Sequence, residues 1–283
     1  MDHTAGSRLL HYTLEKQIGV GGMGTVWAAR DARTGARVAL KLLRGSDTLD
    51  TARVRLLREA HATRRVAHPA IVPVIDVLSF EENPLLVMEL LHGETLRAML
   101  QREQSLALPV AARLLLPIAE ALGEAHSAGI VHRDLKPENI FIEAREGGSG
   151  PVRLLDFGVA QSYASRGGLD QTPITELGTL LGTLAYMAPE QALHPAESNQ
   201  RVDVWAFGVV LYEALSGCRP IEGRTAPETM RQLLVGGITP LRVLSPELPV
   251  EITELVEGML TRRPEDRLGG FETVTNILRS HSH

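Results

Sequence analysis

Hydrophobic positions in the first ninety residues follow the short alternating or clustered patterns of β-strands. β-Branched and aromatic residues gather around a glycine run, and Thr34-Gly35 is a turn signal. One segment, 51–66, instead has apolar residues at helical spacing with arginines around them. We expect a sheet accompanied by one helix. The predicted strands are residues 12–20, 24–31, 35–43, 70–80 and 84–91.

The pattern becomes helical after residue 92. Residues 109–129 begin with a proline, carry apolar side chains at helical spacing and stop at Gly129, and 201–217 is an apolar helix that ends at Gly217. The sequence therefore predicts an α+β chain with a small β-rich lobe and a larger, mainly helical lobe, divided near residue 91. Further helices are expected over 226–237 and 249–260, a loop over 145–151 between strands 139–143 and 152–157, and a long loop over 161–182.

Composition narrows the class of protein without naming a function. The chain is 44% hydrophobic and 22% charged, as folded domains are, and its net charge of -5 argues against a nucleic-acid binder. A single cysteine, Cys218, rules out an intrachain disulfide. We see neither a secretory signal nor a run of about 20 apolar residues that could cross a bilayer. We therefore expect a cytoplasmic chain with no membrane segment of its own, which leaves open an anchor beyond either end of this sequence.

A glycine run, GVGGMGTV (19–26), raises three interpretations. It fits an ordinary glycine-rich turn, a dinucleotide-binding fold, or a flap over phosphates. A dinucleotide-binding fold needs a helix directly after the glycines, whereas Val26 and Trp27 favour a strand. The glycines are therefore expected in a hairpin, where the missing Cβ atoms let backbone amides approach phosphate oxygens closely.

Lys41 ends the apolar run VALK (38–41), in the strand predicted after this flap. A lone lysine is usually a solvated surface residue, but the apolar run makes a half-buried ammonium more plausible here. Such an ammonium needs an anion, and Glu59 in the predicted helix 51–66 is the natural candidate. Taken alone, Glu59 also fits an ordinary position on a helix surface.

The densest polar stretch is HRDLKPEN (132–139), and LLDFG (154–158) adds Asp156 after an apolar strand. The oxygens of Asn139 and Asp156 suit a hard divalent cation such as Mg²⁺. Asp134 can accept a proton from a hydroxyl group, and Lys136 can offset charge on a transferred group. A solvated loop is the alternative, but it rarely combines these groups in this order.

Taken together, these motifs resemble the eukaryotic-like (Hanks-type) serine/threonine protein kinases, and the GGMGTV form is typical of bacterial members. The resemblance runs over residues 12 to 280 and implies the bilobal protein-kinase fold as a single domain, with an N-lobe over 12–91 and a C-lobe over 92–281. The motifs occur in family order: GVGGMGTV, VALK, REA, HPAIV, HRDLKPEN, DFG, GTLAYMAPE, DVWAFG and RPEDR.

The resemblance also implies ATP and Mg²⁺ as cofactors, with Mn²⁺ as an alternative metal. Asn139 and Asp156 would bind the metal. The implied catalytic residues are Asp134, Lys136, Lys41, Glu59 and Thr183. The implied nucleotide-binding residues are Ile18, Gly19, Val20, Gly21, Gly22, Met23, Gly24, Val26, Ala39, Lys41, Met88, Glu89, Leu91 and Phe141. The apolar members of this set fit ordinary core packing nearly as well.

Serine/threonine preference would follow from Lys136 and Thr183, which tyrosine kinases usually replace. Arg133 would pair with a phosphorylated residue of the activation segment, residues 156–190. We expect autophosphorylation there, with Thr175 preferred over Thr172 and Thr179. Two structural pairings are also implied: Glu190 with Arg267, and Asp203 with the backbone of the catalytic loop, residues 132–139. His126 is expected to be structural.

Two other functions fit the sequence less well than a kinase. A pseudokinase-like scaffold usually lacks Lys41, Asp134 or Asp156, and all three are present. A small-molecule phosphotransferase generally lacks a segment such as GTLAYMAPE (182–190), which the resemblance assigns to a platform for peptides. The expected partners are therefore ATP and proteins with serine or threonine acceptors, with no nucleic acid; a homodimer is compatible with the family.

Overall fold

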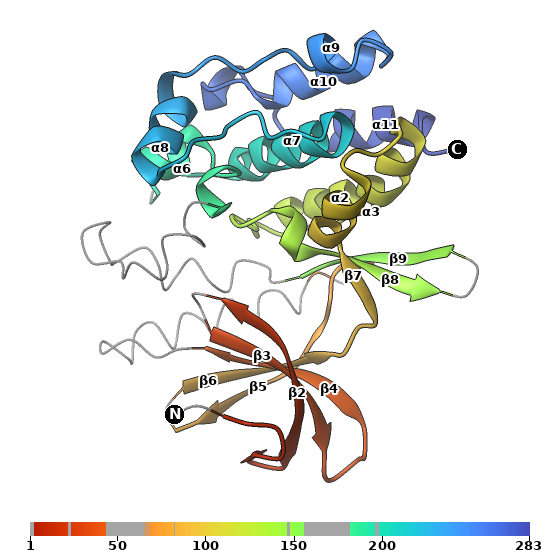
Figure 1. The fold of residues 1–283 in the computed structure, drawn as a ribbon, viewed down its shortest axis with the longest axis vertical. Helices are drawn as coiled ribbons and strands as arrows, with labels where there is room; N and C mark the ends of the chain where they lie inside the picture. The colour runs from red at the N-terminus through yellow and green to blue at the C-terminus, as the bar shows by residue number, and fades with distance from the viewer. Residues whose placement is uncertain are drawn as a thin grey trace.

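Two lobes make up the protein, a sheet of strands at one end and a bundle of helices at the other (Figure 1). This α+β, bilobal architecture confirms the fold class that the sequence predicts. The predicted helix 51–66 lies outside the described residues. The computed structural model describes residues 3–21, 24–43, 66, 68–81, 83–145, 148–155, 182–195 and 198–283.

The N-lobe sheet is antiparallel throughout, with the strand order β1-β2-β3-β4-β6-β5. One face carries its apolar core: Trp27, Leu40 and Val87 lie opposite one another on neighbouring strands and are all buried. Because side chains alternate between the faces of a strand, the residues on either side of these point to the other face. The strands are β1 (Arg8–Leu9), β2 (Tyr12–Gly21), β3 (Gly24–Asp31), β4 (Arg37–Leu43), β5 (Val74–Phe80) and β6 (Asn83–Glu89).

A second sheet, of order β7-β8-β9, lies between the N-lobe sheet and the helices (Figure 1). Its strands are β7 (Gly93–Thr95), β8 (Ile140–Arg145) and β9 (Gly148–Leu154). The loop predicted over 145–151 is wrong, because Arg145 pairs with Gly148 and the ladder continues through most of that segment. Glycine is depleted in strands but does not prevent extended pairing once a partner strand is beside it.

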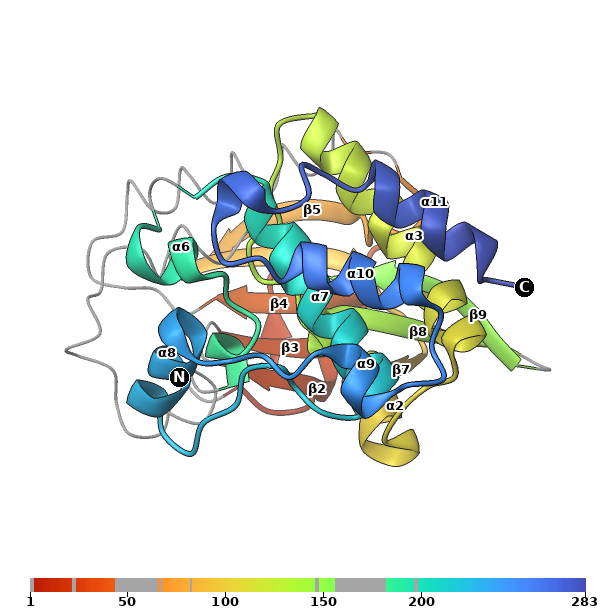
Figure 2. The same ribbon diagram turned by 90° about the horizontal axis from the view of Figure 1, so that it is seen from above.

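The C-lobe helices pack around α7, whose residues 202 to 215 are all buried. A helix that is apolar all round belongs in the middle of a core, and in Figure 2 α7 crosses the centre of this lobe. It packs against α3 and α10, and α3 packs against α11. The helices are α2 (Leu96–Glu103), α3 (Leu108–Ser127), α6 (Pro189–Leu193), α7 (Arg201–Ser216), α8 (Ala226–Val235), α9 (Leu241–Leu244), α10 (Val250–Met259) and α11 (Glu272–Ser280), with 3₁₀ turns η1 (Pro137–Asn139) and η4 (Pro264–Asp266).

A short stretch before β5 is bonded to β9. The Leu154 amide donates to the carbonyl of Ala70 at 2.6 Å, and the Val72 amide donates to the carbonyl of Leu154 at 3.1 Å. Ala70 and Ile71 belong to the apolar core of the helical lobe. Within the described ranges, none of the helices is long and apolar enough to span a membrane.

Candidate active site

The loop before β8 has an unusual backbone that a buried aspartate stabilises. Arg133 has φ of 65°, a left-handed value that side-chain-bearing residues seldom adopt. Asp203, fully buried on α7, accepts hydrogen bonds from the amides of His132 at 2.8 Å and Arg133 at 2.7 Å. Gln191 donates to the Arg133 carbonyl at 2.7 Å. The predicted role of Asp203 as a brace is confirmed.

Two histidines extend this support on either side. His126 on α3 donates Nε2 to the Asp203 carboxylate at 2.7 Å, so its predicted structural role is confirmed. His132 accepts a bond from the Asp134 amide through Nδ1 at 3.2 Å and donates Nε2 to the Leu155 carbonyl at 3.0 Å. These two bonds require the proton on Nε2. His132 therefore links the backbone of Asp134 to the residue directly before Asp156, which lies outside the described residues.

Four of the predicted site residues meet around the Asp134 carboxylate. Lys136 Nζ lies 2.9 Å from each oxygen of Asp134 and donates to Thr183 Oγ1 at 3.3 Å. Asn139 Nδ2 donates to the Asp134 backbone carbonyl at 2.7 Å and to Oδ2 at 3.2 Å. Thr183 thus reaches Asp134 through the Lys136 ammonium. A carboxylate, an ammonium, an amide and a hydroxyl are held together although the hydroxyl is distant in sequence.

The N-lobe sheet turns a second set of predicted residues to the face opposite its apolar core. Val26 lies opposite both Gly19 and Lys41, and Ala39 lies opposite Met88. Paired residues in antiparallel strands share a face. Lys41 is only 5% exposed and Ala39 is 6% exposed, whereas Val26 and Met88 are half-buried, so the β4 part of this face is the most enclosed.

The glycine run forms the predicted hairpin between β2 and β3, with Gly21 opposite Gly24. Gly24 has φ of 148°, a value that glycine reaches readily. Ile18 and Val20 are exposed large apolar side chains on this hairpin, at 48% and 71%. Such exposure is unusual for isoleucine and valine. Gly22 and Met23 lie outside the described residues.

The remaining residues predicted for the adenine site lie on two elements. Glu89 ends β6, and the half-buried Leu91 follows it before β7. Phe141 lies on β8 between Ile140 and Ile142, which are in the helical core, so Phe141 points to the opposite face and is half-buried. The core of the helical lobe therefore does not account for the partial burial of Phe141. That Phe141 faces Val26 and Ala39 across the nucleotide site remains a prediction.

Asn139 is the predicted metal ligand that the structure describes. Its amide nitrogen is engaged with Asp134, so its carbonyl oxygen is the atom through which it would bind a cation. Oxygen ligands are what Mg²⁺ and Mn²⁺ prefer. The donor chemistry of Asn139 therefore fits the implied metal. The second predicted ligand, Asp156, and the predicted partner of Lys41, Glu59, are outside the described residues.

The predicted pair between Glu190 and Arg267 is confirmed. Arg267 Nη1 lies 2.6 Å from Glu190 Oε1, and Nη2 lies 3.0 Å from Oε2, in a two-pronged arrangement. The Arg267 guanidinium also donates to three backbone carbonyls and lies 5.1 Å from the centre of the Trp205 ring. This buried pair fixes the end of the segment that contains Thr183 against the helical lobe.

Sequence reasoning missed a polar cluster beside the catalytic loop. Arg97 on α2 bonds to Glu138 in η1, to Glu213 on α7 and to Tyr186. The partners lie 41, 116 and 89 residues away in sequence, respectively. No local spacing joins them, so only the fold brings the cluster together.

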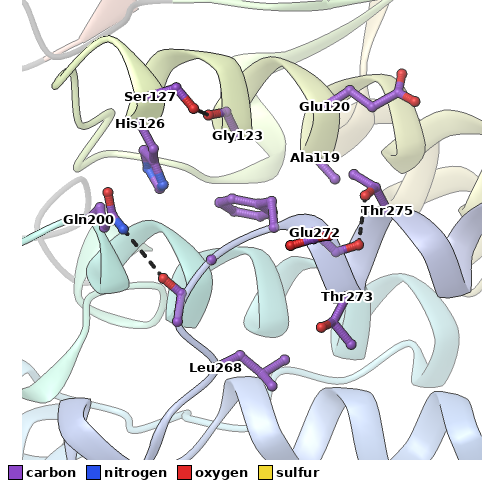
Figure 3. Close-up of a pocket in the computed structure, with 13 residues that line it drawn as sticks. Ala119, Glu120, Gly123, His126, Ser127, Gln200, Leu268, Glu272, Thr273 and Thr275 are labelled. Carbon is purple, nitrogen blue, oxygen red and sulfur yellow. Dashed lines mark hydrogen bonds between the residues drawn. The ribbon is translucent and has the colours of Figure 1, made fainter.

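A hollow of about 760 Å³ lies elsewhere, between α3 and the segment leading into α11 (Figure 3). His126, Gln200 and Leu268 are among its lining residues, and Gln200 donates to the Gly269 carbonyl at 3.3 Å. None of the residues predicted for ATP or metal lines this hollow. It is therefore separate from the candidate active site.

The fold and this set of polar groups define a protein kinase domain, and comparison with known proteins agrees. The family profile described as "Protein kinase domain" matches residues 12–281. The chain belongs to the protein kinase family.

Among curated proteins, the chain is 39% identical to the serine/threonine-protein kinase PknA of Mycobacterium tuberculosis, over 90% of this chain and 58% of that protein. It is 35% identical to the probable serine/threonine-protein kinase PknB of Lactococcus lactis subsp. lactis, over 96% of this chain and 42% of that protein. The chain thus spans about half the length of these relatives. The predicted kinship with bacterial Hanks-type serine/threonine kinases is confirmed.

Among solved structures, the PknI kinase domain of Mycobacterium tuberculosis superposes with a TM-score of 0.73, covering 99% of this chain and 100% of that one. The two sequences are 23% identical, so this likeness supports the fold alone.

Proposed function

We propose that this chain transfers the γ-phosphoryl group of ATP to serine and threonine hydroxyls of proteins. The observation that carries the proposal is the cluster around Asp134, where Lys136 Nζ lies 2.9 Å from both carboxylate oxygens and Asn139 binds the same residue. In this proposal Asp134 orients the acceptor hydroxyl and takes its proton, and Lys136 offsets charge on the phosphoryl group.

The nucleotide would lie between the lobes, under the β2–β3 hairpin and against Val26, Ala39 and Met88. Lys41 would hold the α- and β-phosphates, which agrees with a lysine that is buried on the same face as Val26. Asn139, together with Asp156, would hold Mg²⁺, with Mn²⁺ as an alternative. When bound, the metal neutralises phosphate charge. Fixed positions and charge neutralisation would provide most of the rate acceleration.

Protein acceptors are favoured over small molecules by segment 182–190. Thr183 is tied to Lys136 in the catalytic loop, and Glu190 is tied to Arg267 in the helical lobe, so both ends of the segment are fixed. The relatives' names point to serine and threonine as acceptors. A cytoplasmic location and a homodimer remain expectations from sequence.

Two variants test the proposal directly. Wild-type protein, incubated with radiolabelled ATP, Mg²⁺ and a generic basic protein, should label that protein on serine and threonine. Lys41→Met should label it by about two orders of magnitude less, because a buried charge partner of the phosphates is lost while the aliphatic bulk is kept. The control is Lys16→Met, on β2 and exposed. If folded wild-type protein labels no acceptor, the proposed kinase activity is wrong and a pseudokinase-like scaffold is the better explanation.

Autophosphorylation is a separate part of the proposal. The proposed sites Thr175, Thr172 and Thr179 lie outside the described residues, and their support is the arginine Arg133 before the catalytic aspartate. Intact mass spectrometry of dephosphorylated protein after incubation with Mg-ATP should show added phosphate, reduced in Thr175→Ala. An unchanged mass in an enzyme that labels other proteins would remove this part alone.

A further inference from the structure

The cluster around Arg97 joins three elements that surround the catalytic loop. Arg97 lies at the start of α2, Glu213 lies on α7, and Glu138 lies in η1, between Lys136 and Asn139. The fourth member, Tyr186, is three residues after Thr183. One guanidinium therefore contacts the catalytic loop, the segment beside it and the central helix.

All three nitrogens of the guanidinium are used. Nε donates to Glu138 Oε1 at 2.9 Å, and Nη1 donates to Glu213 Oε1 at 2.9 Å. Nη2 donates to the Tyr186 hydroxyl, which in turn donates to Glu213 Oε2. The guanidinium carbon also lies 5.8 Å from the centre of the Tyr186 ring. A lysine could not reproduce this fork, because it carries a single nitrogen.

The shielded part of the cluster is Tyr186, Glu213 and most of Arg97, whereas the Glu138 side chain is 44% exposed. Tyr186 is 3% exposed and Glu213 is 7% exposed, while the Arg97 side chain retains 21%. Burial, together with the Glu213 charge, raises the pKa of Tyr186 above its usual value, so the phenol keeps its proton. The charge-assisted bonds among Arg97, Tyr186 and Glu213 are therefore little weakened by salt, whereas the bond from Arg97 to Glu138 is exposed and more strongly screened.

Two ties therefore run between the catalytic loop and segment 183–186. The first is the bond from Lys136 Nζ to Thr183 Oγ1, at 3.3 Å. The second runs from Glu138 through Arg97 to Tyr186. The two ties are two residues apart on the catalytic loop and three residues apart on the segment. Together they fix the distance between the segment and the loop and the direction in which the segment runs. Tyr186 also donates to Glu213 on α7, so the bond from Arg97 to Glu138 adds the link from this residue to the catalytic loop itself.

We propose that Arg97 is a positioning residue for the protein acceptor: it holds segment 183–186 in register with Asp134, and thereby sets where the acceptor hydroxyl lies. This inference rests on the proposed kinase function. None of the residues predicted to contact ATP belongs to the cluster, so Arg97 acts on the acceptor side and not on the nucleotide. It acts through Tyr186 and Glu138 and touches no reacting atom.

The test separates transfer to protein from transfer to water. Arg97→Lys keeps the charge but loses the fork, and Tyr186→Phe removes one oxygen while keeping the ring. The matched control is Arg102→Ala on the same helix, whose side chain is 55% exposed and pairs with Glu94 at 2.6 Å. For each variant, kcat and KM are measured with myelin basic protein as acceptor, and ADP release is measured with Mg-ATP alone.

Arg97→Lys should lower kcat/KM for the protein acceptor by about 10- to 100-fold, and Tyr186→Phe by about 5- to 10-fold, while ADP release in the absence of acceptor stays within about 2-fold. The control should match wild type in both assays. Melting temperature is recorded for all of them.

The remaining outcomes distinguish a failure of the proposed role of Arg97 from a failure of the proposed kinase function. Equal losses of protein labelling and ADP release, or wild-type acceptor kinetics in Tyr186→Phe, would overturn the role of Arg97 and leave the kinase function intact. If wild-type protein neither labels the acceptor nor releases ADP, the proposed function itself fails. Should Arg97→Lys not fold, Tyr186→Phe decides the question, since the loss of one oxygen leaves the shape of the core unchanged.

Discussion

At the scale of single residues, the polar groups of the C-lobe site are arranged by hydrogen bonds to Asp134 and Asp203. Asp134 is contacted by Lys136 and Asn139, and its own amide is bound by His132. Asp203 accepts a hydrogen bond from the Arg133 amide and so stabilises the strained backbone there. Asp203 holds the backbone geometry of the loop, and Asp134 is the aspartate for which we propose a chemical role, so their substitutions should have different consequences.

Asp134→Asn is expected to lower kcat for protein phosphorylation by about 10²- to 10⁴-fold, because an amide cannot take the proton of the hydroxyl. The side chain keeps its size and most of its hydrogen bonds, so the melting temperature should change little. Enzyme kinetics and thermal unfolding measure the two effects. Asp266→Asn in η4, on an exposed residue, is the control. Wild-type kcat in Asp134→Asn would contradict the assigned role.

Arg267→Ala is expected to destabilise the fold by about 3–5 kcal/mol, because it leaves the Glu190 carboxylate without its buried partner. Arg242→Ala removes a 63% exposed arginine that pairs with Glu257 at 3.1 Å, and it should cost less than about 1 kcal/mol. Urea unfolding gives both free energies. Similar small losses in the two variants would mean that the buried pair contributes little.

At the scale of elements, α7 organises the helical lobe, and its end is fixed by one glycine. Gly217 has φ of 74° and its amide donates to the Glu213 carbonyl at 2.9 Å, which closes the last turn of the helix. A Cβ atom on Gly217 would lie 3.1 Å from the Gln104 carbonyl oxygen, so this turn also packs tightly against the residue after α2.

Gly217→Ala should therefore lower the free energy of unfolding by more than the about 1–2 kcal/mol that a left-handed conformation alone costs an L-residue. Gly35→Ala isolates that conformational cost, since Gly35 has φ of 73° and open space around its missing Cβ. Chemical denaturation compares the two. Equal losses would show that the contact with Gln104 is relieved at no cost.

At the scale of the whole molecule, each lobe has its own apolar core, in one case on a face of the N-lobe sheet and in the other around α7. The stretch from Ala70 to Val72 bonds to β9 at the junction. In the part of the chain that the structure describes, no group of three or more His, Cys, Asp or Glu side chains could hold a structural metal.

Chelation with EDTA should abolish phosphoryl transfer, because the proposed reaction requires Mg²⁺, and added Mg²⁺ should restore it. The protein should remain folded, because the described residues hold no cluster for a structural metal. Mg-ATP at about 100 times its Kd should raise the stability by about 2.7 kcal/mol, because it binds the folded state only. Thermal unfolding and activity are followed on one sample. A large fall in melting temperature with EDTA alone would point to a metal that the fold itself requires.

Much of this could be predicted from the sequence, for reasons that differ between regions. The strands and long helices follow from apolar periodicity, because burial of one face is a local requirement. Asp134, Lys136 and Asn139 were predictable because six consecutive residues bring them together. The length of the β8–β9 hairpin was not, because its glycines and serine indicate a loop until the neighbouring strand is known.

The sequence by itself determined the kinase architecture and the chemistry of its polar groups, since motifs of a few residues specify both the turn and the side chains it carries. Only the tertiary structure decided which of these groups act together: that Lys136 joins Asp134 to Thr183, that His126 reaches Asp203, and that Arg97 ties Tyr186 to Glu138. These bonds span tens of residues, so they form only once the elements have packed, and the buried ones among them are strengthened because water is excluded.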